Sequence, residues 1–115
     1  MSDSILISIK KNLGLAEEYE IFDPDIIMYI NSILSVLNQI GFGPDKGYRI
    51  TGPENKWSEF IPEDDPRFEN VKTYIYIRVK MLFDPPSTPS VQSALQSIQS
   101  ELEWRINVAS ETPNT

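Results

Sequence analysis

The 115-residue chain contains no cysteine and no histidine. Without these residues it has no disulfide framework, zinc finger, thiolate nucleophile or Ser-His-Asp triad. Positive charge is also scarce, with 10 Lys and Arg against 17 Asp and Glu and a formal net charge of −7. A broad basic face for DNA phosphates is therefore not expected. Long apolar runs are missing, so neither a membrane span nor a signal peptide is predicted.

What is present resembles an ordinary globular protein. The apolar share is 40% and the charged share 23%, close to the average for globular domains, and the length suits one core. We predict a single helical domain over residues 1–109 and a mobile polar tail over 110–115. Composition favours a non-enzymatic protein.

Apolar spacing predicts a mainly α fold, a small bundle of three to four helices. A short first helix carries Ile5, Leu6 and Ile9 and is capped by Asp3 or Ser2. The clearest helix runs from Pro24 to about Ile40, with Asp23 as its N-cap and Gly41 as its stop.

The region of about 41–67 is rich in glycine, proline and acidic residues and is predicted to be a loop-rich insertion. It has room for a short strand at Tyr48–Thr51, and Asn55 is expected to cap a helical turn that carries Trp57 and Phe60. The triplet Glu63, Asp64, Asp65 is the best carboxylate cluster. It either holds a divalent cation or forms a solvated acidic loop, and without calcium-loop spacing the second interpretation is favoured.

Residues 68–83 carry two conflicting patterns. The stretch 71–79 alternates and is rich in β-branched and aromatic residues, which is typical of a strand. Phe68, Val71, Ile75, Val79 and Leu82 nevertheless share one helical face. Because 16 residues without glycine or proline are long for a strand, we predict a helix.

A last helix is predicted to begin with Ser90 as its cap after the prolines of 85–89. Its expected core face consists of Val91, Ala94, Leu95, Ile98, Leu102 and Ile106. Trp104 lies about 200° around the helix from Leu102. With Glu101, Glu103 and Arg105 around it, Trp104 is a candidate anchor for a subunit or partner contact. The alternatives are that Trp104 covers the edge of its own core and that the three charges form a solvated face.

Several motifs, in this order, resemble the head–tail connector family of tailed bacteriophages, adaptors once described as DNA-packaging proteins. The matching stretches are Ile9–Leu15, Phe22–Asn31, Leu37–Pro44, Val71–Pro86 and Glu101–Arg105. They include Gly-Phe-Gly-Pro at 41–44, Lys-Thr-Tyr at 72–74, Phe-Asp-Pro-Pro at 83–86 and Glu-Trp-Arg at 103–105. Only the loop at 45–70 and the tail match weakly.

The resemblance implies a helical structural virion protein without catalysis or cofactor. It implies a homo-oligomeric ring below the portal protein, at the head–tail junction of the virion, assembled in the host cytoplasm. Such a ring extends the DNA channel without sequence-specific DNA binding and is the platform for the next head-completion or tail protein. The alternative is a small acidic regulator that mimics the charge of DNA. A metal-dependent nuclease is a third, less favoured alternative.

Overall fold

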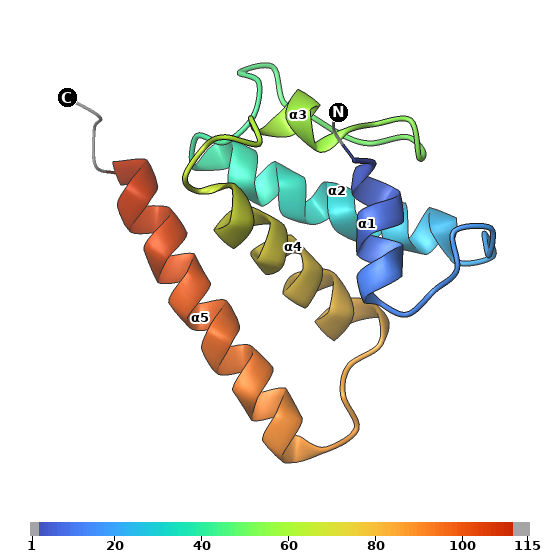
Figure 1. Cartoon of the computed structure of the whole chain (residues 1–115). Coiled ribbons are helices and arrows are strands. Elements are labelled where there is room, and N and C mark those ends of the chain that lie inside the picture. The colour runs from blue at the N-terminus through green and yellow to red at the C-terminus, as the bar shows by residue number, and fades with distance from the viewer. Residues whose placement is uncertain (1–2, 112–115) are drawn as a thin grey trace.

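The computed structural model describes residues 3–111 of the chain, with side chains described as far as Val108. It contains α1 (Ile5–Asn12), α2 (Asp23–Gln39), α3 (Trp57–Phe60), α4 (Phe68–Phe83) and α5 (Pro89–Glu111) (Figure 1). Over this described range there is no strand, only an isolated bridge between Ser4 and Lys56. The predicted mainly α fold is confirmed. The predicted tail begins inside α5, and residues 112–115 lie outside the described part.

The core is built on α2 and α4, which lie side by side (Figure 1). The prediction of a helix over 68–83 is confirmed, because Val71, Ile75 and Val79 recur at helical spacing and are all fully buried. Helical spacing therefore outweighs the local preference for a strand. From the insertion, Trp57 is fully buried, and its ring meets that of Phe68 edge-on at 5.9 Å.

Several helix starts differ from the predictions. In α1 the cap is Ser4, whose Oγ accepts a hydrogen bond from the Ile7 N–H at 3.2 Å, and not Asp3 or Ser2. Asp23 is the first residue of α2 and not its N-cap. Ser90 lies inside the first turn of α5, which begins at Pro89. The N-cap of α3 is Lys56, and Asn55 instead accepts a hydrogen bond from the Thr51 N–H at 2.8 Å.

The predicted short strand at Tyr48–Thr51 is wrong. The side-chain amide of Asn31 on α2 takes the place of a partner strand, since its Nδ2 donates to the Ile50 carbonyl at 3.0 Å and its Oδ1 accepts from the Ile50 N–H at 2.7 Å. A single amide side chain thereby satisfies both backbone groups of a buried residue. The insertion is held to α2 without a sheet.

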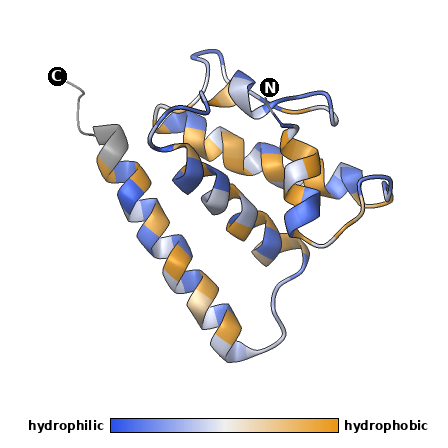
Figure 2. Cartoon of the chain, viewed as in Figure 1, coloured by the Kyte–Doolittle hydropathy of each residue, from blue (hydrophilic) through white to orange (hydrophobic). Residues whose placement is uncertain are grey.

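The last helix packs against the rest of the molecule most closely through its C-terminal half, although Leu95 in its first half is partly buried against the core. Leu102 and Ile106 are 7% and 2% exposed, whereas Ile98 is 45% exposed and Val91 is exposed to a similar degree. In the first half of α5 the predicted core face is therefore wrong for Val91, Ala94 and Ile98, which are exposed. It is right for Leu95, which packs against the core. The N-terminal end of α5 extends beyond the other helices (Figure 1). Apolar residues continue along this half (Figure 2). None of the described helices is both long and apolar enough to cross a membrane.

Candidate subunit interface

One flank of α5 faces away from the bundle. At about 100° per residue, seven side chains of this helix fall within about 140° of its circumference. They are Val91, Ala94, Ile98, Glu101, Trp104, Arg105 and Val108. All seven are exposed, and we refer to them as the outer flank. Trp104, at 66%, is the most exposed of them among the large apolar residues.

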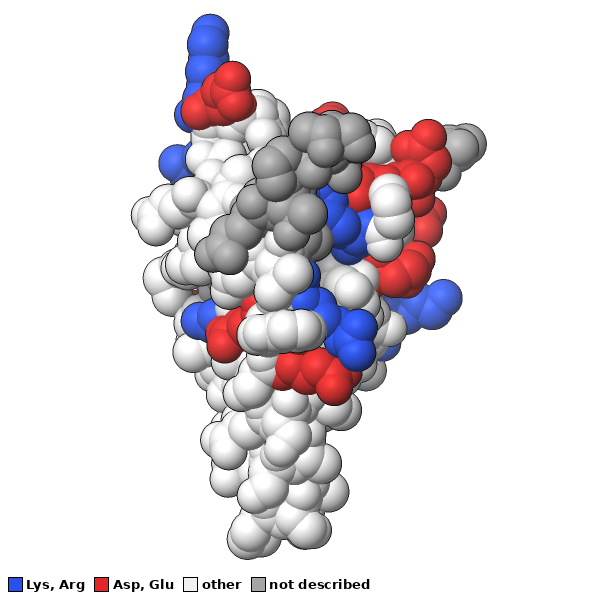
Figure 3. All heavy atoms as spheres, turned by 90° about the vertical axis from the view of Figure 1, so that its left-hand side faces the viewer, with Lys and Arg blue, Asp and Glu red and all other residues white. Residues whose placement is uncertain are grey.

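The outer flank has two chemically distinct halves. Toward the C-terminus, Arg105 Nε lies 3.4 Å from Glu101 Oε2 across one helical turn, beside Trp104. An exposed pair of this kind contributes only about 0.3–0.5 kcal/mol, so both side chains can rearrange against a partner. Toward the N-terminus the surface carries no charge, as the tapering lower part of the molecule shows (Figure 3).

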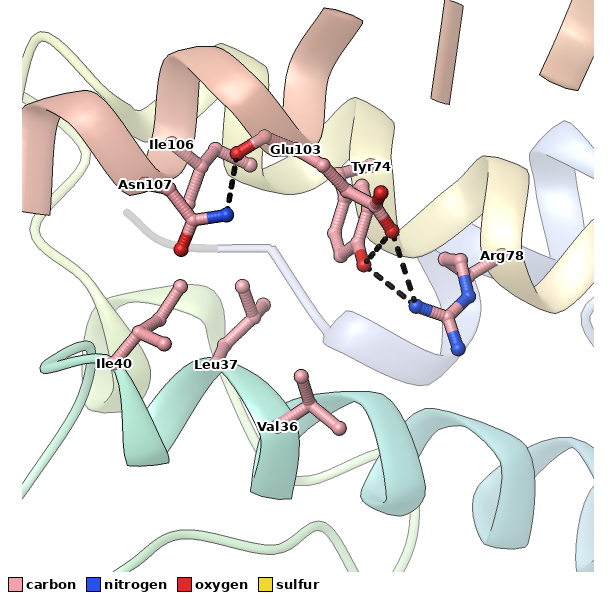
Figure 4. A pocket seen from close by; sticks show the side chains of 8 residues that line it. All are labelled: Val36, Leu37, Ile40, Tyr74, Arg78, Glu103, Ile106 and Asn107. Atoms are coloured by element: carbon pink, nitrogen blue, oxygen red, sulfur yellow. Dashed lines mark hydrogen bonds and ion pairs between the residues drawn. The ribbon is translucent and has the colours of Figure 1, made fainter. Parts of the chain in front are cut away.

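Glu103 points the other way, toward α4 (Figure 4). The Tyr74 hydroxyl donates to Glu103 Oε2 at 3.0 Å, and Arg78 Nη1 donates to the Tyr74 oxygen at 2.6 Å. Burial, and then the hydrogen bond to Glu103, raise the pKa of Tyr74 above its ordinary value. The structure therefore separates the four predicted residues. Glu101, Trp104 and Arg105 lie together on the outer flank, while Glu103 fastens α5 to α4.

A small cavity of about 160 Å³ lies beneath this contact, between α2, α4 and α5 (Figure 4). Its walls include Val36, Ile40 and Ile106 in addition to the Tyr74–Arg78–Glu103 group. Pockets for cofactors and small substrates usually measure about 300–1,000 Å³. This cavity is therefore better suited to one inserted side chain than to a cofactor.

The acidic triplet of the insertion behaves as a structural turn. Asp65 is bound by Arg67, whose Nη2 lies 2.7 Å from Asp65 Oδ2 and whose backbone N–H donates to Asp65 Oδ1 at 2.8 Å. Hydrogen bonds from the Arg67 side chain hold the pKa of Asp65 below its ordinary value, while Glu63 and Asp64 are exposed. Among the residues that the structure describes, no group of three carboxylates could hold a metal ion.

Sequence reasoning did not find that Val91, Ala94 and Ile98, in the first half of α5, are exposed. We refer to residues 89–100 as the uncharged arm. The sequence did contain a sign of this exposed surface. Residues 85–100 contain no charged side chain, although 23% of the residues in the whole chain are charged. Interface cores are depleted in charge in the same way.

Comparison with known proteins gives one match. A family model described as Phage connector protein covers residues 5–113. No curated protein matches the chain. No solved structure matches it either.

Proposed function

This chain belongs to the phage connector protein family, and from this premise we propose that it is a head–tail connector, acting as a ring below the portal protein. The family consists of structural phage proteins and is not known for catalysis. In the proposed role, copies of the chain extend the DNA channel of the filled capsid. The far side of the ring receives the next head-completion or tail protein.

The observation that carries the proposal is the outer flank of α5, above all the 66% exposure of Trp104. A large aromatic side chain with charged neighbours is a typical interface anchor. A ring needs a heterologous contact, in which two different patches of one subunit meet and rotation closes the assembly. The outer flank supplies one such patch outside the core.

The net charge supports passage of DNA through the ring. A subunit with a formal net charge of −7 repels phosphates on average, which suits DNA that slides through the ring. A DNA-mimicking regulator would instead need free carboxylates gathered on one face. Asp23, Asp65 and Glu101 each lie within 4 Å of a Lys or Arg nitrogen of the same chain, so these three carboxylates are not available for such a face.

The mass of the purified protein should be measured over a concentration series, with and without the portal protein of the same phage, and the samples imaged for annuli by electron microscopy. We expect a ring-sized species, alone or on the portal. A protein that stays strictly monomeric at high concentration and is unchanged by portal would contradict the proposal.

A further inference from the structure

Two stretches of the chain are long and free of charge. Residues 26–44, which include most of α2, form one of them, and residues 85–100, which include the uncharged arm, form the other. Every other part of the chain carries charged residues at short intervals. The two stretches lie on different helices.

Each stretch leaves an uncharged face exposed to solvent. On α2, the spacing i, i+4, i+7, i+8 places Met28, Ser32, Ser35 and Val36 on one exposed side. Met28 is 56% exposed. On the uncharged arm, Val91, Ala94 and Ile98 follow the spacing i, i+3, i+7. Small residues on both faces (Ser32, Ser35, Ala94) allow two helices to approach closely, with ridges packed into grooves.

An open groove of about 530 Å³ follows the α2 face, with Met28, Ser32 and Ser35 in its lining. Within the part of the chain that the structure describes, Arg49 is the single charged residue that lines it. Among the described residues, none from α5 lines this groove, so the uncharged arm of the same chain does not fill it. A groove with one cation and no carboxylate in its lining suits an occupant from an acidic protein.

The charge of the chain favours a second copy as that occupant. Copies that each carry −7 repel one another, so self-association is least opposed where neither surface carries acid. The α2 face and the uncharged arm are two unlike surfaces of this kind, which is what a heterologous contact requires. We propose that the uncharged arm of one copy packs in the α2 groove of the next copy. This inference rests on the proposed function, since it names the contact that closes the ring.

The absence of cysteine permits a direct test. The single variants Met28→Cys and Ile98→Cys are mixed in equal amounts, assembled with portal and oxidised. We expect a disulfide-linked species of about twice the 13.2 kDa of one chain. Each variant alone should give none, because the contact joins unlike surfaces. Ile21→Cys, at a similarly exposed apolar residue, replaces Met28→Cys in the control mixture and should not link to Ile98→Cys.

The double variant Met28→Cys, Ile98→Cys should give a ladder of multiples up to the closed ring. Linkage in the Ile98→Cys variant alone would overturn the proposal in favour of a two-fold contact. Rings in the micrographs without linkage in the mixture would overturn it while leaving the proposed function intact. If no ring forms with or without portal, both are wrong.

A charge placed on the arm gives an independent test. Ile98→Glu should weaken assembly at least tenfold, whereas Ile21→Glu should leave it unchanged. Both side chains are substantially exposed, so we expect both variants to keep the wild-type melting temperature within a few degrees. Equal assembly by Ile98→Glu and the wild type would contradict the contact.

Discussion

Lys10 and Asp23 join two helices that are separated in sequence by an acidic connector. The Lys10 Nζ lies 2.9 Å from Asp23 Oδ1, and the Lys10 side chain is only 2% exposed. The same ammonium donates to the Glu17 carbonyl at 2.9 Å. One buried cation therefore holds the end of α1, the connector and the start of α2 together.

We expect Lys10→Ala to lower the free energy of unfolding by about 3 kcal/mol, because it leaves the Asp23 carboxylate without its cation. The neighbouring Lys11 is exposed, and Lys11→Ala should cost less than about 0.5 kcal/mol. Urea unfolding of both variants measures the difference. Equal losses would show that the ion pair contributes nothing specific.

The two tryptophans should behave in opposite ways. Trp57 is fully buried and Trp104 is 66% exposed. Trp57→Ala should lower the free energy of unfolding by about 3–5 kcal/mol. Trp104→Ala should leave the monomer folded and weaken ring formation by about 2 kcal/mol per interface. Thermal melts and mass measurements separate the two effects, and unfolding as the main defect of Trp104→Ala would assign that residue to the core.

The amide of Asn31 should matter more than its partial exposure indicates. Asn31→Ala removes both hydrogen bonds to the backbone of Ile50, and a cost of about 2 kcal/mol follows from leaving buried polar groups unpaired. Asn107 makes one exposed hydrogen bond to the Glu103 carbonyl in its own helix. Asn107→Ala, the control, should cost less than about 0.5 kcal/mol in urea unfolding. A similar loss in both variants would contradict the role of Asn31.

Two glycines with nearly the same positive φ provide a matched pair. Gly14 has φ +84° and open space around it, while a Cβ at Gly43, with φ +81°, would lie 2.6 Å from the Phe60 ring. Gly14→Ala should cost about 1 kcal/mol, because a non-glycine residue in this conformation is strained. Gly43→Ala should cost clearly more, since the clash is added to the same strain. Chemical unfolding of the two variants tests this, and equal costs would show that Phe60 moves aside freely.

The turn at Asp65 should make stability depend on acid pH. Because Arg67 lowers the pKa of Asp65 in the folded state, this carboxylate stabilises the fold above its unfolded pKa of about 4. The contribution is lost as the pH falls through the folded pKa. Asp65→Asn should therefore be less stable than the wild type at pH 7, with the gap narrowing below about pH 4. Asp64→Asn, at an exposed neighbour, should show no such gap in unfolding experiments across this range.

The helices could be predicted wherever one sequence feature, such as clear end signals or the length of an uninterrupted segment, outweighed the others. For α2, the Asp-Pro-Asp start and the glycine stop placed both ends within one residue or so, and the length of 68–83 correctly outweighed its strand-like composition. The strand at Tyr48–Thr51 was wrong because a side chain 19 residues away satisfies the backbone of Ile50. A pattern of neighbouring residues cannot show a hydrogen-bond partner that lies so far away in the sequence.

The candidate interface on α5 was only partly predictable, because helical spacing shows which side chains share a face but not what covers that face. Helical spacing placed Trp104 off the stripe of Leu102, and Trp104 is exposed. The same spacing placed Val91, Leu95 and Ile98 on that stripe, yet of these three only Leu95 packs against the core, and Val91 and Ile98 are exposed. Periodicity shows which side chains share a face. Which members of that face meet their own chain depends on how the helix is rotated and placed against its neighbours.

The uncharged arm is fixed at both ends, and this should strengthen its binding to a partner. Pro85, Pro86 and Pro89 restrict the connection to α4, and Leu102 and Ile106 fix the other end in the core. A partner that docks there meets a preorganised helix and not a free tail. The conformational entropy of ordering this segment is lost when the subunit folds, so a modest contact area can suffice for tight docking.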